Sequence, residues 1–309
     1  MSCLTTLPKG IKDYLEQTNS CPLCANKNFK LKVSVRGMDF FECVQCKFRI
    51  ANPYLNEEGM GLLYTNSEIL SEVNPHLENY YEYKVGEGMN QTRKDYLRVL
   101  DSCRSFLGFH SSKPTLFEVG YGTGSFLLEA VHKGWNVDGV DTSEENQQLL
   151  VNNENLNVQS GSFSTFSADE SNYDVVALWD VIEHTIDPSS FVKKAKLLLN
   201  HGGLLVLATP NIGGLLNKVA EFLYNISFGA LKVGVKQLYV PEHVGYFSPK
   251  TLKKLVVDQG FIVKEVVLTE TDLQRYGFSP LLKVGLSILF FFARLLRMQN
   301  RVIIIAQKP

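Results

Sequence analysis

Hydrophobic and polar residues follow two different periodicities along this chain, and from residue 114 onward the two alternate. Short continuous apolar runs are typical of buried strands, and here they occupy residues 115–119, 135–141, 173–180, 203–211, 261–270 and 301–309. Helical spacing of apolar residues, with an Asp-Pro or Ser-Pro start in the last two cases, is found in residues 120–134, 187–203 and 248–261. Strands that alternate with helices predict βαβ units, and therefore an α/β domain with a parallel sheet.

Residues 17–56 have a different pattern, in which two Cys-x-x-Cys pairs are separated by eighteen residues. Cys21 and Cys24 form the first pair, Cys43 and Cys46 form the second, and the alternation between them predicts a short hairpin. Two such pairs hold a tetrahedral ion from both sides, which favours a zinc ribbon over four reduced cysteines without metal. Because all four ligands are cysteines, no coordination position stays open, and the zinc is expected to be structural.

The composition limits the number of domains and the class of partner. The chain has 309 residues, which accommodate the ribbon, a helical connector at 57–110 and a main domain at 111–309. Lys and Arg total 31 and Asp and Glu total 32, and this balance disfavours a dedicated nucleic-acid-binding protein. The first twenty residues contain no apolar signal segment, so a cytoplasmic location is expected.

A glycine-rich loop follows the first strand of the main domain. It is Gly-x-Gly-x-Gly at residues 120–124, with Glu118 before it and Asp141 at the end of the next strand. Glycines let a backbone approach a ligand closely, and an acid in this place can accept both ribose hydroxyls. These features fit a dinucleotide or S-adenosylmethionine. Ser125, where a dinucleotide loop needs glycine or alanine, and Glu118, unfavourable beside a pyrophosphate, favour the methyl donor.

Five segments resemble, in order and spacing, the motifs of class I S-adenosylmethionine-dependent methyltransferases. They read FEVGYGTGSFLLEA, VDGVDTS, DVVALWDVIEHTIDP, GGLLVLATPN and HVGYFSPKTLKKLVVDQGF. Within this family the chain is similar to the subgroup that includes the ubiquinone-biosynthesis O-methyltransferases, and the similarity extends over residues 90–309. The resemblance implies a Rossmann-like seven-stranded sheet with helices on both faces and a reversed final hairpin.

The resemblance also assigns site residues by motif position. The glutamate and the glycine loop would face the methionine part of the donor, the acid after the second strand the ribose, and a Ser-Phe pair the adenine. The cofactor-binding residues are then Glu118, Gly120, Tyr121, Gly122, Gly124, Asp141, Thr142, Ser162, Phe163, Trp179 and Asp180. Ser162 departs from the family, in which an acid often stands there to bind the adenine amino group.

The segment ALWDVIEHTIDP places Asp180, Glu183 and His184 directly after a buried strand. Similar ubiquinone-pathway enzymes hold a divalent cation with an acid-x-x-Glu-His arrangement, so Mg²⁺ or Mn²⁺ bound by these three residues is one interpretation. A second interpretation makes His184 a metal-free general base, with His243 of PEHVGYF as the other candidate. In a third, Glu183 and His184 only satisfy backbone groups at the start of a helix.

Two apolar insertions, at about 213–240 and 274–300, bear on the methyl acceptor. The first contains a helical stripe of Leu215, Val219, Phe222 and Ile226. The second contains an uncharged core, 284–293, which is too short to span a bilayer. The insertions either pack on each other as a lid or dimer surface, or contact a membrane through 279–298. The preferred acceptor is a small molecule, lipid-linked compound or glycan precursor, methylated at oxygen.

Three other functions fit parts of the sequence. A ribbon fused to a methyltransferase is similar to certain ribosomal RNA methyltransferases, and the basic residues of the hairpin suit phosphate, but the charge balance disfavours this function. A sugar C-methyltransferase fits the ribbon, although similar enzymes have a further C-terminal domain. A non-catalytic adaptor would retain the fold without binding S-adenosylmethionine.

Overall fold

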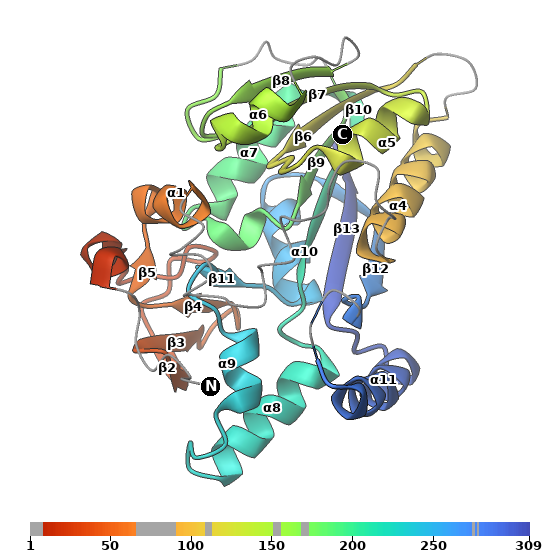
Figure 1. Cartoon of the computed structure of the whole chain (residues 1–309). Coiled ribbons are helices and arrows are strands. Elements are labelled where there is room, and N and C mark those ends of the chain that lie inside the picture. Colours follow the sequence, from red (N-terminus) through yellow and green to blue (C-terminus); the bar gives the residue numbers. More distant parts are fainter. Residues whose placement is uncertain are drawn as a thin grey trace.

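The computed structural model describes residues 9–65, 91–108, 113–150, 156–167, 173–273, 276 and 278–309. Its central element is a seven-stranded sheet with the order β12-β13-β10-β9-β6-β7-β8 (Figure 1). The strands are β6 (Thr115–Val119), β7 (Asn136–Asp141), β8 (Leu156–Ser160), β9 (Tyr173–Trp179), β10 (Leu199–Pro210), β12 (Ile262–Thr269) and β13 (Arg301–Gln307). β13 runs antiparallel to both of its neighbours, whereas β8, β7, β6, β9 and β10 pair in parallel. The predicted α/β class and the reversed final hairpin are confirmed.

Helices cover both faces of this sheet because its central strands, β6, β9 and β10, are buried on both sides. Along β9, Val175 and Ala177 pack with one cluster, and Val176 and Leu178 pack with the other. The first cluster includes side chains of α4 (Gln91–Leu107), α5 (Ser125–His132) and α6 (Glu144–Leu150). The second includes α7 (Pro188–Leu198) and α10 (Pro249–Asp258). The continuous apolar strand runs therefore reflect burial between two helical layers.

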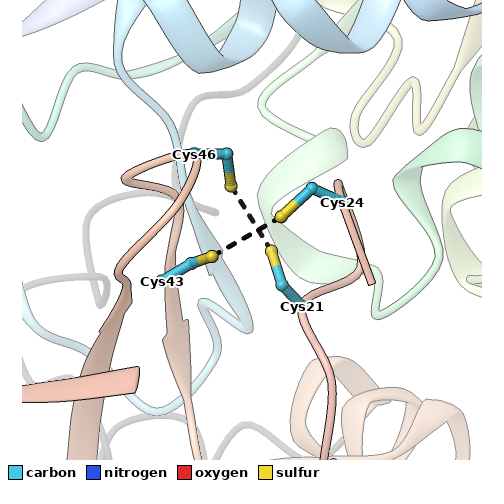
Figure 2. Close-up of side chains that lie close together, drawn as sticks. All are labelled: Cys21, Cys24, Cys43 and Cys46. Carbon is cyan, nitrogen blue, oxygen red and sulfur yellow. Dashed lines mark hydrogen bonds between the residues drawn. The ribbon is translucent and has the colours of Figure 1, made fainter. Parts of the chain in front are cut away.

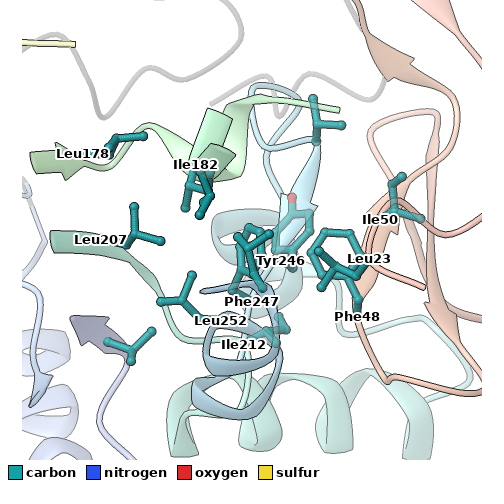
Figure 3. Packing of buried hydrophobic residues seen from close by; sticks show 14 of the residues in the cluster. Leu23, Phe48, Ile50, Leu178, Ile182, Leu207, Ile212, Tyr246, Phe247 and Leu252 are labelled. Atoms are coloured by element: carbon teal, nitrogen blue, oxygen red, sulfur yellow. The ribbon is translucent and has the colours of Figure 1, made fainter. Parts of the chain in front are cut away.

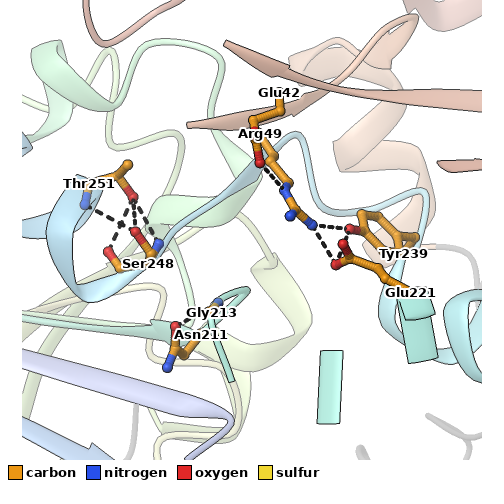
Figure 4. A network of polar contacts seen from close by, with 8 residues as sticks. All are labelled: Glu42, Arg49, Asn211, Gly213, Glu221, Tyr239, Ser248 and Thr251. Atoms are coloured by element: carbon orange, nitrogen blue, oxygen red, sulfur yellow. Dashed lines mark hydrogen bonds and ion pairs between the residues drawn. The ribbon is translucent and has the colours of Figure 1, made fainter. Parts of the chain in front are cut away.

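The predicted helix starts are formed by local hydrogen bonds. Asp187 accepts a bond of 2.9 Å from the backbone N–H of Ser190, with Pro188 at the first position of α7. Ser248 and Thr251 form a reciprocal capping box before α10, visible in Figure 4. These caps fix where the chain leaves the sheet edge, and so they position the loops of the site.

The N-terminal module is a small sheet whose fourth strand comes from the main domain. Its order is β11-β4-β3-β2, and the predicted hairpin is β2 and β3. The elements are a 3-10 helix (Lys9–Tyr14), β1 (Leu15–Glu16), β2 (Phe29–Val35), β3 (Met38–Cys43), β4 (Arg49–Ala51), β5 (Tyr54–Leu55), α1 (Glu57–Thr65) and β11 (Gly245–Tyr246). β1 pairs with β5, so the module begins before residue 17. Of the predicted connector, residues 66–90 and 109–110 lie outside the described residues.

The ribbon and the main domain share one hydrophobic core (Figure 3). The rings of Phe48 and Phe247 have centroids 4.9 Å apart, and Phe40 lies 4.9 Å from Tyr239. A Cβ atom on Gly245 would lie 2.7 Å from the ring of Phe48, so glycine allows β11 to approach β4 this closely. The ribbon is therefore packed as a layer of the molecule.

A buried charged network fastens the same contact (Figure 4). Arg49 of β4 forms ion pairs with Glu42 at 3.1 Å and with Glu221 of α8 (Leu215–Ile226) at 2.5 Å. It also donates to Tyr239, whose hydroxyl donates to Glu221 at 2.9 Å. Since a buried charge is costly without partners, this network favours one position of α8 against the ribbon.

The insertions form three helices, α8 (Leu215–Ile226), α9 (Val233–Leu238) and α11 (Pro280–Leu295). Three residues of the predicted α8 stripe, Val219, Phe222 and Ile226, are exposed to 36%, 61% and 56%, whereas Asn217 and Glu221 are buried. The apolar side of α8 thus faces outward. Residues 274, 275 and 277 of the second insertion lie outside the described residues. In the described ranges, every helix falls short of what a bilayer span requires.

Candidate active site

A cavity of about 930 Å³ opens at the carboxyl ends of β6, β7, β9 and β10. Ligands of open α/β sheets bind at this edge, and ligand pockets occupy roughly 300–1,000 Å³. The glycine loop, α1 and the insertion helices α8, α9 and α11 all contribute residues to the cavity lining. Its volume and its lining suit two ligands placed end to end.

The glycine loop needs its glycines for two physical reasons. Gly120, Gly122 and Gly124 have φ of 71°, 53° and 71°, which other residues rarely adopt. A Cβ atom on Gly120 would also lie 2.6 Å from Val181, and one on Gly124 would lie 2.3 Å from Leu150. Gly120 and Gly122 line the cavity, and Gly124 is the N-cap of α5.

Asp141 links the second strand to this loop. Its carboxylate accepts hydrogen bonds from the backbone N–H groups of Gly122, at 2.8 Å, and Ser143, at 2.9 Å. Asp141 and Thr142 both line the cavity, in the place predicted for the ribose. Tyr121 instead points into the core, where its hydroxyl donates to the carbonyl of Gln159 at 3.2 Å. Its expected contribution to the donor site is therefore limited to its backbone.

Glu118 lies beneath the glycine loop and is 3% exposed. Burial raises the pKa of this carboxyl well above its usual value, and the charge of Asp141 raises it further, although Arg93 acts in the opposite direction. One of its oxygens, Oε2, has no hydrogen-bond partner among the described residues. The cavity lining does not include Glu118, so its predicted contact with the methionine end of the donor stays a prediction.

The adenine end predicted from Ser162 and Phe163 also lines the cavity. Phe163 is 4% exposed and packs at 6.4 Å from Phe117. Ser162 contacts Ser164, whose hydroxyl donates to Glu57 of α1 at 3.2 Å. Position 162 has no acid, but the carboxylate of Glu57 on α1 lies close to it through Ser164. In the sequence, the one signal for this carboxylate is the acidic first turn of α1.

Trp179 and Asp180 close the end of β9. The indole of Trp179 stacks on Tyr96 at 4.1 Å with an interplanar angle of 14°. Tyr96 donates to Asp180 at 2.7 Å, and Arg301 forms an ion pair with the other carboxylate oxygen. Sequence reasoning missed Tyr96 and Arg301. The only signal was a charged residue at the start of the apolar run 301–309.

Glu183, His184 and His243 lie together in the next part of the cavity, with one ligand atom of each within 4.8 Å of the others. Glu183 and His184 belong to a short 3-10 helix, Ile182–His184, and therefore do not project from a regular α-helix. The carbonyl of Glu242 lies 2.7 Å from Nδ1 of His184. Because a carbonyl can only accept, Nδ1 carries the hydrogen and the lone pair is on Nε2.

The electrostatics of this cluster are dominated by burial. Burial lowers the pKa of His184 and lowers that of His243 well below its usual value, so both rings are neutral near pH 7. Glu183 is 1% exposed, and neither of its carboxylate oxygens makes a hydrogen bond of normal geometry to a described residue. Burial, and then the charge of Asp180, raise the pKa of Glu183 to about 8.

The residues predicted to bind a cation therefore differ by one from the three residues whose side chains lie together in the structure. Asp180 is held by Arg301 and Tyr96, and His243 takes its place beside Glu183 and His184. One carboxylate and two imidazoles are a common donor set for divalent transition metals, and an unpartnered buried carboxylate is consistent with such an ion. The chemistry of these side chains fits a cation or a proton acceptor.

Beyond this cluster the cavity wall becomes apolar. α1 contributes Met60 and Tyr64, and the insertion helices contribute Leu216, Val233, Leu238, Leu282, Leu286 and Phe290. An acceptor placed here would have its reacting group at the histidines and its apolar part between α8, α9 and α11. The insertions are therefore part of the site.

The four cysteines of the ribbon surround a single point (Figure 2). The sulfur atoms of Cys21 and Cys46 are 3.5 Å apart, and so are those of Cys24 and Cys43. A tetrahedral zinc ion with Zn–S bonds of ~2.3 Å separates its sulfurs by roughly 3.8 Å. The cluster has the geometry of a structural zinc site and does not line the cavity.

A family profile and a curated relative agree with the fold. A family profile described as a methyltransferase domain matches residues 90–266. The ubiquinone biosynthesis O-methyltransferase of Psychrobacter arcticus is 24% identical over 222 residues, which are 69% of this chain and 78% of the relative.

Solved structures agree at the level of the fold. Phosphoethanolamine N-methyltransferase 2 of Haemonchus contortus, in complex with S-adenosyl-L-methionine, has a TM-score of 0.54 at 15% identity, over 84% of this chain and 63% of that one. The 1,6-didemethyltoxoflavin-N1-methyltransferase of Burkholderia thailandensis has a TM-score of 0.53 at 12% identity, over 86% and 97% of the two chains.

The chain therefore belongs to the methyltransferase-domain family, since the profile spans more than half of its length. It is an S-adenosylmethionine-dependent methyltransferase, as the resemblance of its motifs predicted. This result is contrary to the non-catalytic adaptor.

Proposed function

We propose that this enzyme transfers the methyl group of S-adenosylmethionine to a hydroxyl oxygen of a lipid-linked or similarly amphipathic acceptor. The observation that carries the proposal is the continuity of one cavity from Asp141, through His184, to the apolar residues of α8, α9 and α11. The order of these surroundings matches a donor with a ribose, a reacting hydroxyl and a hydrophobic tail. The O-methyltransferase name of the Psychrobacter relative supports oxygen as the acceptor atom.

The reaction is a direct displacement at the sulfonium methyl group. The acceptor oxygen forms a bond to the methyl carbon, the carbon–sulfur bond breaks, and its electron pair leaves on the sulfur of S-adenosylhomocysteine. The hydroxyl proton passes to a base, and Nε2 of His184 is suited to take it because Nδ1 is fixed by Glu242. His243, whose ring centroid is 5.0 Å from that of His184, is the second candidate. The remaining contribution is alignment of donor and acceptor.

A divalent cation would be held by Glu183, His184 and His243, and when bound it would lower the pKa of the acceptor hydroxyl as a Lewis acid. Binding of a cation at these three residues can be tested without measuring activity. Added Mn²⁺ or Mg²⁺ would raise the Tm of the native protein and leave that of Glu183→Gln unchanged. Equal Tm values of the native protein with and without the ions would favour the metal-free base.

We also propose that a structural zinc ion occupies the cluster of Cys21, Cys24, Cys43 and Cys46. The four sulfur atoms lie within 4.8 Å of one another, and two pairs of them are 3.5 Å apart, which supports this site. Because the ribbon shares its core with β11 and α9, the ion would stabilise the wall of the acceptor cavity as well as the ribbon.

The acceptor class is tested with the methyl-labelled donor and fractionated cell extract. The proposal predicts label in an organic-soluble product that is stable to mild base, as an ether is. Label found only in water-soluble small molecules, RNA or protein would contradict the amphipathic acceptor, and label in RNA would favour the ribosomal RNA alternative.

A further inference from the structure

The outer sides of α8 and α11 form an exposed apolar surface, here called the α8–α11 face. The two helices are in contact and lie together at one end of the molecule, away from α5 and α6 (Figure 1). The large apolar side chains exposed to between 36% and 83% are Val219, Phe222, Leu223, Ile226, Leu281, Leu282, Val284, Ile288, Phe291, Phe292, Leu295 and Leu296. On α11 they recur at helical spacing, as they do in helices that bury one side. Such a surface marks a binding site, because isolated soluble domains rarely expose one this large.

The charges of the same segments have one sign. Residues 213–239 and 279–299 contain six basic residues, Lys218, Lys232, Lys236, Lys283, Arg294 and Arg297, and one acidic residue, Glu221. Glu221 is buried against Arg49 and does not reach the surface. Arg294 is paired with Glu270 at 2.8 Å. The other five basic residues still give these segments an excess of positive charge, in a chain whose net charge is −1.

This charge distribution decides between two occupants. An isologous dimer would bring the basic residues of two copies together, and the like charges would oppose association. An anionic bilayer surface attracts the same residues, and its acyl boundary accepts the leucine and phenylalanine side chains. No helix in the described ranges is suited to span the bilayer, so contact is limited to the interface.

The face is also continuous with the acceptor cavity. Leu282 is 47% exposed on the face and lines the cavity, and Leu286 and Phe290, on the inner side of α11, line it as well. We propose that the α8–α11 face docks on the interface of an anionic membrane. The inference does not depend on the acceptor, because docking is measured without methyl transfer.

The test is co-flotation of the purified full-length chain with vesicles of phosphatidylcholine alone, or of phosphatidylcholine and phosphatidylglycerol in equal parts. Binding is expected only to the anionic vesicles, and it should weaken as salt is raised. The double variant Ile288→Gln, Leu295→Gln keeps the net charge of the protein and should bind at least about tenfold more weakly. Leu197→Gln, at a 46% exposed leucine of α7, is the matched control and should bind as the native protein does.

Two further measurements separate weaker docking from unfolding. The double variant should retain the native Tm and the native affinity for S-adenosylmethionine, so that weaker flotation cannot come from unfolding. Lys218→Gln, Arg297→Gln should reduce binding to anionic vesicles. Native protein that floats with neither vesicle, or that sediments as a dimer dissociated by the Ile288→Gln, Leu295→Gln double substitution, would overturn membrane docking.

Discussion

Arg301, the first residue of β13, forms an ion pair with Asp180, the residue that follows β9. The two side chains are 6% and 21% exposed, and Tyr96 bridges them by accepting from Arg301 and donating to Asp180. Asp180 has a φ of 57°, and its carboxylate is outside the cluster of Glu183, His184 and His243. The ion pair thereby orders Asp180 at the edge of the sheet that lines the cavity.

The first prediction concerns this pair. Arg301→Met should lower the free energy of unfolding by about 3 kcal/mol, because it leaves the carboxylate of Asp180 half-buried without its partner. Urea unfolding measures the change. The double variant Asp180→Asn, Arg301→Met removes both charges and should recover part of the loss. An Arg301→Met protein as stable as the native one would show that the ion pair has no structural role.

The second prediction concerns the donor. Asp141→Ala should weaken binding of S-adenosylmethionine about tenfold or more, since charge-assisted hydrogen bonds contribute roughly 1.5–3 kcal/mol. The variant loses the expected ribose contacts and also the bond that holds Gly122. Titration calorimetry measures the affinity, with Asp101→Ala, at a surface aspartate of α4, as the control. Unchanged affinity in folded Asp141→Ala would refute the role of Asp141. Gly122→Val should also weaken binding of S-adenosylmethionine, because the valine side chain would take up space at the wall of the cavity.

The third prediction concerns the ribbon. Protein purified without chelator should contain one zinc ion per chain, and Cys43→Ser should contain little or none. Cys103→Ala, at the buried cysteine of α4, should keep the metal. Elemental analysis measures the content. Because the ribbon and main domain share a core, Cys43→Ser should also lower the Tm of the whole chain. Folded native protein without zinc would contradict the site.

The fourth prediction follows from the raised pKa of Glu183. In the folded chain this carboxyl stays protonated up to a pKa of about 8, whereas its ordinary value is 4.5. The folded state therefore binds more protons between these values, and the stability contributed by Glu183 is lost as pH rises through them. In metal-free protein, Glu183→Gln should match native stability near pH 4.5 and exceed it increasingly towards pH 8.

Chemical unfolding at several pH values, with chelator present, measures this difference. Glu144→Gln, at an exposed glutamate of α6, is the control for the loss of one carboxylate. A Glu183→Gln protein whose advantage over the native chain is the same at every pH would mean that Glu183 is not a buried, unpaired acid.

The sequence predicted the parts of this protein that depend on neighbouring residues. Apolar periodicity and the Pro-containing caps located the strands and α7 and α10, because burial and capping act within a few residues. The glycine loop and Asp141 were placed correctly since both follow strand ends at one sheet edge. The four cysteines were predicted together because their spacing limits where they can meet.

What the sequence did not predict depends on contacts between distant segments. Pairing of Gly245–Tyr246 with β4 joins the ribbon to the main domain, and Arg49 reaches Glu221 across 172 residues. The replacement of Asp180 by His243 in the cluster depends on Arg301, which is 121 residues away. The periodicity of α8 predicted an apolar side but not its direction, because an amphipathic helix can turn that side to the core, to a partner or to a membrane.

We infer that one cavity binds the donor at Asp141 and activates the acceptor at His184, and a comparison of three rates measures whether it does. Methyl transfer from labelled S-adenosylmethionine to the lipid extract is measured for native protein, His184→Ala and the exposed-site control His201→Ala. We expect His184→Ala to lose about a hundredfold in turnover and to keep its donor affinity within a few-fold, whereas His201→Ala should behave as the native protein does. Near-native turnover of His184→Ala would contradict it and leave His184 a structural role only.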